Sequence, residues 1–489
     1  MRGTTKRIAC SAVVALVSAD GAAGQPQVRF ETLYLFEGSN AEDGFGGTVS
    51  GAGDVNGDGF DDFAIGAVRD DSAGPNFGSV RVYCGATGDV VYEVFGNSES
   101  GRFGSEVRRA GDVNADGFDD IIVGEWLDDT NGRSAGSVSV FAGPHGTELY
   151  RFFGDETQDF FGISFGGGGD VNADGFDDII VGAPGDDNTG DGSGSARIFS
   201  GATGEILYQF DGDDDFDDFG FGNAIIGDID ADGFDDFMIG APQDDNTSTN
   251  AGRVTVYSGA VGEVLYLIDG DGGFDEIGIR ISGAGDINAD GFDDFIIGVT
   301  KDDDNGISSG SASVYSGVTG DVLFRYSGEN ETDQFGSAVN GLGDINGDGF
   351  DDFSVSARST DFAGEASGSV YIYSGANGNL LTRIDGIDEL DFFGECEGAA
   401  GDLNGDGLNE LIFGSSNGGI DNAGYAMVLT PVLCDIADTN CDGICSTADF
   451  GAWLIAFTSR APACDQNTDG TCTPADLNAW VLNYNACIN

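Results

Sequence analysis

One block of sequence recurs at a fixed spacing along most of the chain, and this repetition constrains the fold more than any other feature. The block reads GDVNGDGFDDF from Gly53 and returns every 58 residues in seven copies, the last reading GDLNGDGLNEL from Gly401. A fixed period of this length indicates stacked or radially arranged supersecondary units. In the third copy, short β-rich runs separated by Gly and Asp clusters predict four strands. They are Ile163–Phe165, Ile179–Val181, Ala196–Phe199 and Ile206–Phe210.

Seven units of four strands predict an all-β protein with a seven-bladed β-propeller over residues 25–430, rather than an open solenoid. The last copy ends at Tyr425–Thr430, after its third strand. The segment Val28–Phe36 precedes the first copy and matches the fourth strand of a repeat. We therefore expect the N-terminal segment to complete the last blade and close the ring, which removes an exposed sheet edge. No segment before residue 430 has helical periodicity.

The charge balance excludes several classes of function. Asp and Glu number 86 and Lys and Arg number 19, which gives a net charge of −67. Such a field repels nucleic acid and anionic membrane surfaces and attracts cations. The single histidine, His145, argues against His-based catalysis and His-ligated zinc or copper. Apolar residues make up 40% of the chain, too many for a disordered acidic protein.

Residues 1–24 have the layout of a secretory signal peptide. Arg2, Lys6 and Arg7 form a basic start, Ile8–Val17 is a short and mainly apolar run, and small residues follow at positions 22–24. The run is too short to span a bilayer, and no later segment reads as transmembrane. We expect the mature protein to be secreted or attached at the cell surface.

Each repeat contains an acidic loop whose spacing is typical of a calcium site. In the first loop, Asp54, Asn56, Asp58 and Asp62 occupy positions 1, 3, 5 and 9, and Gly59 at position 6 allows a sharp turn. The residue at position 7 offers its backbone carbonyl. Hard oxygen ligands at alternating positions around a glycine suit Ca²⁺, and without a cation the carboxylates would repel one another. The alternative is an Asx-turn, in which Asp and Asn serve only as turn formers.

The other loops repeat this pattern, so calcium is the predicted cofactor. The predicted ligands of the seven loops are Asp54, Asn56, Asp58, Phe60 and Asp62; Asp112, Asn114, Asp116, Phe118 and Asp120; Asp170, Asn172, Asp174, Phe176 and Asp178; Asp228, Asp230, Asp232, Phe234 and Asp236; Asp286, Asn288, Asp290, Phe292 and Asp294; Asp344, Asn346, Asp348, Phe350 and Asp352; and Asp402, Asn404, Asp406, Leu408 and Glu410.

The repeat resembles the FG-GAP repeat of the integrin α-subunit head and of secreted bacterial propellers. The resemblance rests on Phe45-Gly46, on the acidic loop and on Gly182-Ala183-Pro184, and it extends over about residues 28–430. The Phe-Gly pair recurs in most copies, whereas Gly-Ala-Pro is less faithful. The resemblance implies a calcium-bearing seven-bladed propeller used for adhesion or ligand binding. It does not identify the ligand, because a fold does not determine a function.

We expect a ligand on the face opposite the acidic loops, where the longer loops lie. This face is mostly acidic, but it carries one tryptophan and a few cationic residues that suit a sugar or an acidic group. The alternative is that these residues reflect ordinary loop variation. These candidate ligand-binding residues are Arg69, Trp126, Arg133, Lys301 and Arg358. Paired acids such as Asp70-Asp71 and Asp186-Asp187 recur in the same loops and either hold further cations or cap turns.

The tail, residues 434–489, contains two EF-hand-like loops that each lead into a helical stripe. Their predicted metal ligands are Asp438, Asn440, Asp442 and Asp449, and Asp465, Asn467, Asp469 and Asp476. The duplicated loop and helix with Asp at position 12 resembles the dockerin module, which implies a cohesin-like or envelope receptor. Six cysteines predict three disulfides, with 15 possible connectivities. They are Cys434, Cys441, Cys445, Cys464, Cys472 and Cys487. Cys84 and Cys396 in the propeller either pair across the closing blades or stay free.

The sequence therefore predicts a secreted calcium-binding propeller that acts as a non-catalytic adhesion or ligand-binding module and is attached through its tail. The expected partner of the propeller is an extracellular polysaccharide or a surface protein. One alternative is an extracellular polysaccharide-degrading enzyme, although no loop departs from the repeat as an active site would. A second alternative is a structural component of a surface or matrix.

Overall fold

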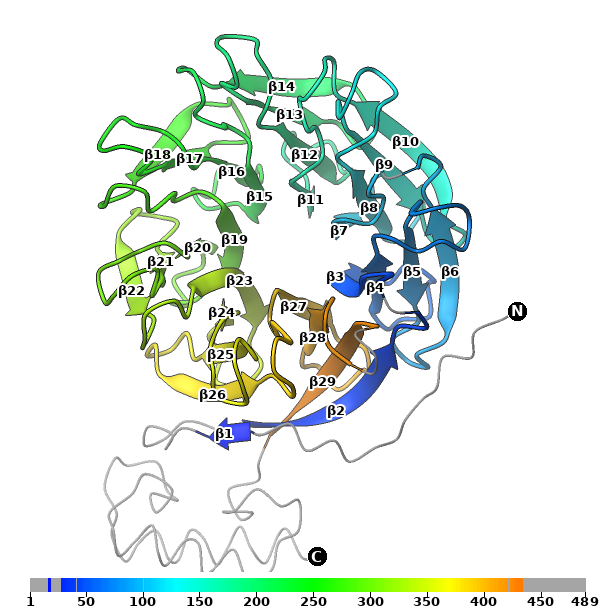
Figure 1. The fold of residues 1–489 in the computed structure, drawn as a ribbon, viewed down its shortest axis with the longest axis vertical. Coiled ribbons are helices and arrows are strands. Elements are labelled where there is room, and N and C mark those ends of the chain that lie inside the picture. The colour runs from blue at the N-terminus through cyan, green and yellow to red at the C-terminus, as the bar shows by residue number, and fades with distance from the viewer. Residues whose placement is uncertain (1–15, 19–27, 41, 100, 420–422, 434–489) are drawn as a thin grey trace, which may run out of the picture.

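Seven antiparallel sheets surround an open centre (Figure 1). This computed structural model describes residues 16–18, 28–40, 42–99, 101–419 and 423–433. Each sheet is a blade of four main strands, and the innermost strands contact one another in ring order from the first blade to the seventh and back to the first. The prediction of an all-β, seven-bladed propeller is confirmed. No helix occurs in the part of the chain that the structure describes.

The strands of each blade run from the centre outward. In the first to third blades they are β3 (Phe45–Gly53), β4 (Asp62–Ala67), β5 (Ser79–Tyr83) and β6 (Val90–Phe95); β7 (Val107–Gly111), β8 (Asp120–Glu125), β9 (Ser137–Ala142) and β10 (Thr147–Phe153); and β11 (Phe165–Gly169), β12 (Asp178–Ala183), β13 (Ser195–Phe199) and β14 (Ile206–Asp211).

In the fourth to seventh blades they are β15 (Gly222–Gly227), β16 (Asp236–Ala241), β17 (Arg253–Tyr257) and β18 (Val264–Asp269); β19 (Arg280–Gly285), β20 (Asp294–Val299), β21 (Ser311–Tyr315) and β22 (Val322–Ser327); β23 (Phe335–Gly343), β24 (Asp352–Ala357), β25 (Ser369–Tyr373) and β26 (Leu380–Asp385); and β27 (Cys396–Gly401), β28 (Glu410–Ser415), β29 (Tyr425–Leu433) and β2 (Val28–Glu37).

The seventh blade joins the two ends of the propeller, as the sequence predicted. Its outer strand β2 pairs antiparallel with β29, so the first strand of the ring lies beside the last (Figure 1). The Tyr34 hydroxyl of β2 donates to the Gly85 carbonyl of the first blade at 2.7 Å. The same bond links successive blades elsewhere, as in Tyr150 to Gly201 and Tyr208 to Gly259. The closing blade is therefore fastened to its neighbour in the same way as the others.

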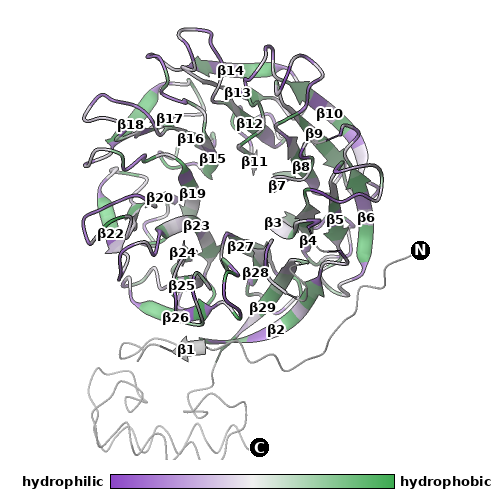
Figure 2. Ribbon diagram, viewed as in Figure 1, coloured by the Kyte–Doolittle hydropathy of each residue, from purple (hydrophilic) through white to green (hydrophobic). Residues whose placement is uncertain are grey.

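The hydrophobic core lies between neighbouring blades. Val80 and Val82 of the first blade pack in one buried cluster with Val107 and Ile121 of the second. Aromatic pairs recur at this depth, and Phe63 stacks on Tyr83 with centroids 5.4 Å apart. Such a pair adds about 0.5–1.5 kcal/mol beyond its area burial. Figure 2 shows hydrophobic residues along the strands and hydrophilic residues along the connecting loops.

The inner strands differ from the prediction. We expected the first strand of the third repeat at Ile163–Phe165, but β11 covers Phe165–Gly169 and consists mostly of glycine. Glycine normally weakens a strand, but it permits close approach of neighbouring backbones. A Cβ on Gly167 would lie 3.0 Å from the Cα of Ala110 in the adjacent blade. Crowding at the centre of the ring therefore favours the residues that sequence patterns treat as breakers.

Two predicted segments fall largely outside the described residues. Within the predicted signal peptide only β1 (Leu16–Ser18) is described, and its backbone pairs with β26 as a fifth strand of the sixth blade. The tail, for which two EF-hand-like loops, helices and three disulfides are predicted, lies outside the described residues. Of the two alternatives for Cys84 and Cys396, the structure shows free thiols.

Candidate functional site

The acidic loops lie on one face of the propeller, between the first and second strands of each blade. The Gly85 amide, in the turn between the third and fourth strands, donates to Asp62 Oδ1 at 2.9 Å. Equivalent bonds join Gly201 to Asp178 and Gly259 to Asp236. The loops and these turns therefore share a face, as expected from alternating strands.

The first aspartate of each loop organises a tight turn. Asp54 accepts hydrogen bonds from the backbone amides of Gly57 at 2.7 Å, Asp58 at 3.1 Å and Gly59 at 2.9 Å. Asp228, Asp286, Asp344 and Asp402 accept the bonds from positions 5 and 6 in their own loops. The Asx-turn alternative is therefore present. It does not exclude a cation, because an ionised carboxylate has about four acceptor sites.

The backbone of the loop takes the same shape in all seven copies. The glycine at position 6 has φ between +87° and +92° in every loop, and a Cβ there would meet no atom within 4 Å. Glycine is therefore needed at this position for its conformation rather than for space. Position 4 is also left-handed, although four loops place alanine there, with φ near +53°. These four are Ala115, Ala173, Ala231 and Ala289. A non-glycine residue in this region costs about 1 kcal/mol or more.

The acid at position 9 is fully buried at the base of each loop. Burial raises the pKa of Asp62 to about 7, and the charges of Asp58 and Asp54 raise it further, against a hydrogen bond from Gly85 that lowers it. The pKa is also raised to about 7 for Asp120, Asp178, Asp236 and Glu410, to about 6 for Asp294 and to about 8 for Asp352. Burial is the largest cause in each, so a cation beside these acids would relieve an unfavourable concentration of negative charge.

Two of the loops bring possible metal-ligating atoms together in the described part of the chain. Ligand atoms of Asp228, Asp230 and Asp236, at positions 1, 3 and 9, lie within 4.8 Å of one another. In the first loop the same holds for Asp58, Asp62 and the nearby Cys84. The donor set is rich in carboxylate oxygen, which suits a hard divalent cation.

The remaining predicted ligands lie close to these groups. The Asn56 amide donates to both carboxylate oxygens of Asp62, at 2.9 Å and 2.8 Å, so position 3 contacts position 9. The Phe60 amide at position 7 donates to Asp58 Oδ1 at 3.0 Å, which places it beside position 5. The predicted ligands of the tail lie outside the described residues.

Sequence reasoning missed one group of loop residues, the aspartates at position 8. The Asp54 amide donates to Asp119 Oδ2 of the next loop at 2.9 Å, and the Asp119 amide returns a bond to the Asp54 carbonyl at 3.3 Å. The Asp402 amide donates to Asp61 at 2.8 Å and closes this chain of loops between the seventh and first blades. The sequence carried a signal for these residues in the repeated Asp-Asp pair at positions 8 and 9, but only the acid at position 9 was predicted to be a ligand.

The five candidate ligand-binding residues divide into two groups. Trp126, Lys301 and Arg358 each contact a residue that immediately precedes the Phe-Gly or Ile-Gly pair of a repeat. The Trp126 and Phe160 rings are 5.8 Å apart, Lys301 pairs with Glu276 at 2.6 Å, and Arg358 donates to Gln334 at 2.6 Å. Arg69 and Arg133 are exposed and do not join this arrangement.

The paired acids on the same face act as turn caps and partners of arginine. Asp70 accepts hydrogen bonds from the Ser72 amide at 2.7 Å and the Ser79 hydroxyl at 2.8 Å, and pairs with Arg81 at 3.1 Å. Burial favours a higher pKa for Asp70, but these hydrogen bonds and the charge of Arg81 outweigh it and hold the pKa below its ordinary value. Asp71 caps the Asn76 amide at 2.6 Å. The contacts of Asp70 and Asp71 correspond to the turn-cap alternative, whereas ligand atoms of Asp244, Asp213 and Asp217 lie within 4.8 Å of one another and could hold a cation.

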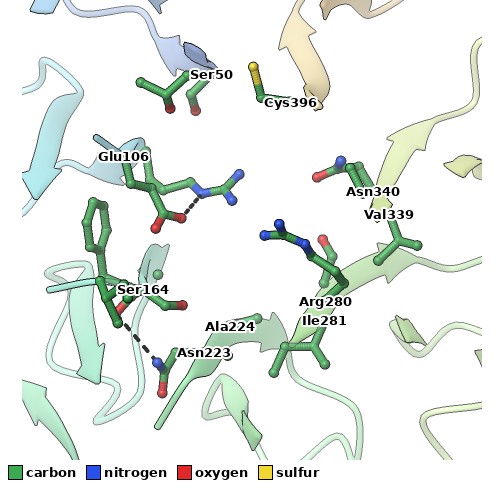
Figure 3. A pocket seen from close by; sticks show the side chains of 18 of the residues that line it. Ser50, Glu106, Ser164, Asn223, Ala224, Arg280, Ile281, Val339, Asn340 and Cys396 are labelled. Carbon is green, nitrogen blue, oxygen red and sulfur yellow. Dashed lines mark hydrogen bonds and ion pairs between the residues drawn. The ribbon is translucent and has the colours of Figure 1, made fainter. Parts of the chain in front are cut away.

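The inner strands line a central channel that sequence analysis did not anticipate as a site. Its volume is about 520 Å³, and Trp126 is among the lining residues. The wall also carries Glu106, Arg108 and Arg280, and Figure 3 shows Glu106 and Arg280 pointing toward one another. The sequence alone did not reveal which residues of the glycine-rich strands face inward.

Glu397 also lines the channel and differs from the residues at the same position of the other repeats. The side chain is 3% exposed, and its Oε1 accepts a hydrogen bond from the Ser354 hydroxyl at 3.0 Å. Its Oε2 has no hydrogen-bond partner in the described part of the chain. Burial raises the pKa of Glu397 to about 8, against hydrogen bonds that lower it.

The geometry and the sequence together define a seven-bladed propeller built from seven copies of one 58-residue repeat. The sequence profile of the family described as FG-GAP repeat matches residues 161–199 and 221–257. The chain is 31% identical over 218 residues to integrin alpha-5 of Xenopus laevis, a match that covers 41% of this chain and 20% of that protein. It is 28% identical over 203 residues to integrin alpha-V of Gallus gallus, covering 38% of this chain and 19% of that protein.

The similarity therefore concerns one part of much longer proteins, because the chain spans about a fifth of the length of these relatives. Integrin alpha-8 of Mus musculus is 32% identical over 167 residues, covering 31% of this chain and 15% of that protein. The solved structure of Saccharomyces cerevisiae Sqt1 aligns with 85% of this chain and all of its own, at 11% identity and a TM-score of 0.44. The described residues contain no helix with the length and hydrophobicity of a membrane crossing.

Proposed function

We propose that this protein is a secreted, calcium-binding β-propeller that acts as a non-catalytic adhesion or ligand-binding module. The observation that carries the proposal is the ring of seven acidic loops with one backbone conformation, each with a buried acid of raised pKa at its base. In each loop the carboxylates and amides at positions 1, 3, 5 and 9 and the carbonyl at position 7 would hold Ca²⁺. The ion would neutralise the loop and keep it rigid.

The proposed partner of the propeller is an extracellular polysaccharide or a surface protein. Similarity to integrin alpha subunits supports a role in binding extracellular ligands. The paired acids on the face opposite the acidic loops form turn contacts and ion pairs, which supports a scaffold rather than acid–base chemistry. Examples are Asp70 and Asp186, which pairs with Arg197 at 3.3 Å. Residues 1–24 would direct export, and residues 434–489 would attach the protein to a cohesin-like or envelope receptor.

The test is binding of the mature protein to a panel of polysaccharides and cell-envelope fractions, with calcium and with EDTA, while polymer length is followed. A variant that ends at Leu433 serves as the tail-less comparison. We expect calcium-dependent retention of both proteins with intact polymer. Polymer shortening would replace the proposal by a polysaccharide-degrading enzyme. Retention only with the tail present would assign recognition to the tail.

A further inference from the structure

The central channel combines small and apolar residues with long charged side chains. Glycine, serine and alanine make up 11 of the 30 lining residues, and the charged ones are Glu106, Arg108, Arg109, Arg280, Glu395 and Glu397. Figure 3 shows Glu106 and Arg280 reaching inward from opposite sides of the open centre. The volume of about 520 Å³ falls within the range of small-molecule sites.

Three arginines line the channel, of which Arg109 pairs with Asp119 at 2.8 Å, whereas Arg108 and Arg280 are incompletely paired. Arg108 Nε donates to Glu106 Oε1 at 3.0 Å, and its two terminal nitrogens have no hydrogen-bond partner among the described residues. The side chain of Arg280, which lies in the ladder between β19 and β20, forms no ion pair or hydrogen bond with any residue that the structure describes. By contrast, Arg151, outside the channel, pairs with Glu125 at 2.7 Å and with Asp128 at 2.9 Å. A guanidinium group has five N–H donors, so the channel contains unused donor capacity.

The surroundings of Arg280 favour an incoming anion. The Arg280 side chain is exposed to solvent in the channel, where Glu106 and Glu395 attract its charge and Arg358 and Arg108 repel it. An exposed guanidinium group without a protein partner keeps its N–H donors available for acceptor oxygens. The Ser105 hydroxyl also lines the channel, is buried and has no partner in the described part of the chain. Guanidinium and hydroxyl donors in one cavity are suited to an oxyanion.

We propose that the channel binds a sugar acid, with its carboxylate held by Arg280 and by the terminal nitrogens of Arg108. Guanidinium groups bind carboxylates through paired N–H···O bonds. Trp126 lines the channel and is half-buried, so part of its indole ring is exposed for stacking on a pyranose ring. Ser164 and Asn340 in the lining supply polar groups for hydroxyls. This site is separate from the proposed function, which would stand without it.

The test is isothermal titration calorimetry of the full chain in calcium at low chloride. The probes are glucuronate, glucose as the uncharged control, inorganic sulfate and inorganic phosphate. We expect glucuronate to bind and glucose to bind on the order of 10- to 100-fold more weakly, as expected for a lost charge-assisted interaction. Arg280→Gln should weaken glucuronate binding by a similar factor. Arg325→Gln removes one positive charge outside the channel and should have no effect.

Two further readouts separate the site from a structural role. Without ligand, Arg280→Gln should melt at nearly the temperature of the wild type, because the side chain is exposed and forms no hydrogen bond or ion pair with the described residues. Trp126→Leu should weaken glucuronate binding more than sulfate binding. Equal affinity of wild type and Arg280→Gln for glucuronate, or no measurable binding by the wild type, would overturn the proposal. Tighter binding of sulfate or phosphate than of glucuronate would overturn its sugar-acid part.

Discussion

The ring of acidic loops and the wall of the central channel are built from the same seven repeats, yet they differ in how strictly the repeat is kept. Position 6 of every loop is glycine with φ near +90°. One position near the start of each inner strand lines the channel and carries a different residue in every blade. These residues are Thr48, Glu106, Ser164, Gly222, Arg280, Ala338 and Cys396. The comparison teaches that repeated residues build the scaffold, whereas specific chemistry lies in departures from the repeat.

Removal of calcium should have the largest effect, because it acts on all seven loops at once. We expect EDTA to lower the melting temperature on the order of 10 °C, since each ion at 100 times its dissociation constant contributes about 2.7 kcal/mol. Differential scanning calorimetry with and without added calcium measures the shift. Magnesium at the same concentration is the control for ionic strength. An unchanged melt in EDTA would contradict a structural role for calcium.

Glu397→Gln tests a buried residue that differs from its counterparts in the other repeats and affects the stability of the scaffold. The folded pKa of about 8 lies above the ordinary value, so stability is fully present below about pH 4.5 and is lost as the pH rises through about 8. Glutamine keeps the acceptor for Ser354 and does not ionise. The variant should therefore exceed the wild type at pH 9 by about 2–4 kcal/mol, with little difference near pH 4.5.

Denaturant unfolding across this pH range measures the difference. The control is Glu365→Gln, which removes a charge from an exposed side chain. Parallel stability profiles for Glu397→Gln and the wild type would show that Glu397 is not held in an unfavourable ionisation state.

Asp120→Asn removes one loop acid, and its effect on stability should have opposite signs with and without calcium. With calcium we expect a loss of about 2–3 kcal/mol, because one ion is bound less well. In EDTA we expect a small gain, because one of several like charges is gone. Calorimetric titration should count one calcium fewer than in the wild type. Glu148→Gln, at an exposed position of β10, is the matched control. Loss of stability in EDTA as well as in calcium would assign Asp120 a role in turn structure alone.

Ala115→Gly should have the smallest effect and tests the left-handed position of the loop. The residue has φ +52°, so glycine should stabilise the EDTA-treated protein by about 0.5–1 kcal/mol. The reverse change in the first loop, Gly57→Ala, should cost more, because its Cβ would lie 2.5 Å from Phe118 Cε1. Chemical denaturation of both variants provides the measurement. A destabilising effect of Ala115→Gly would mean that the loop relies on the alanine methyl group.

Local repetition explains why much of the fold was predictable. The four strands per repeat follow from patterns visible within one copy, and the seven repeats and the closing strand at Val28–Phe36 follow from comparing the copies along the chain. The inner strand was misplaced because Gly166–Gly169 reads as a turn, whereas crowding between blades makes glycine suitable there. That crowding is a property of the assembled ring and has no local signal.

The candidate site was predictable only in part for the same reason. The loop ligands could be proposed from spacing, but the bond from the Asp54 amide to Asp119 joins two loops 65 residues apart. The channel charges Glu106 and Arg280 come from different blades, and nothing local in either repeat indicates that they face one another. Interactions between copies of a repeat appear only when the ring is assembled.

The seventh blade makes a circular object from a linear chain, and this has a consequence for synthesis. Strand β2 is the first of the ring to leave the ribosome, and its partner β29 is the last. The ring therefore has no complete intermediate during translation, and the earliest strand must wait for the latest. A product released shortly before Tyr425 would carry six finished blades and an unpaired β2, which is an open edge for aggregation. Completion of this clasp would mark the difference between a finished molecule and a truncated one.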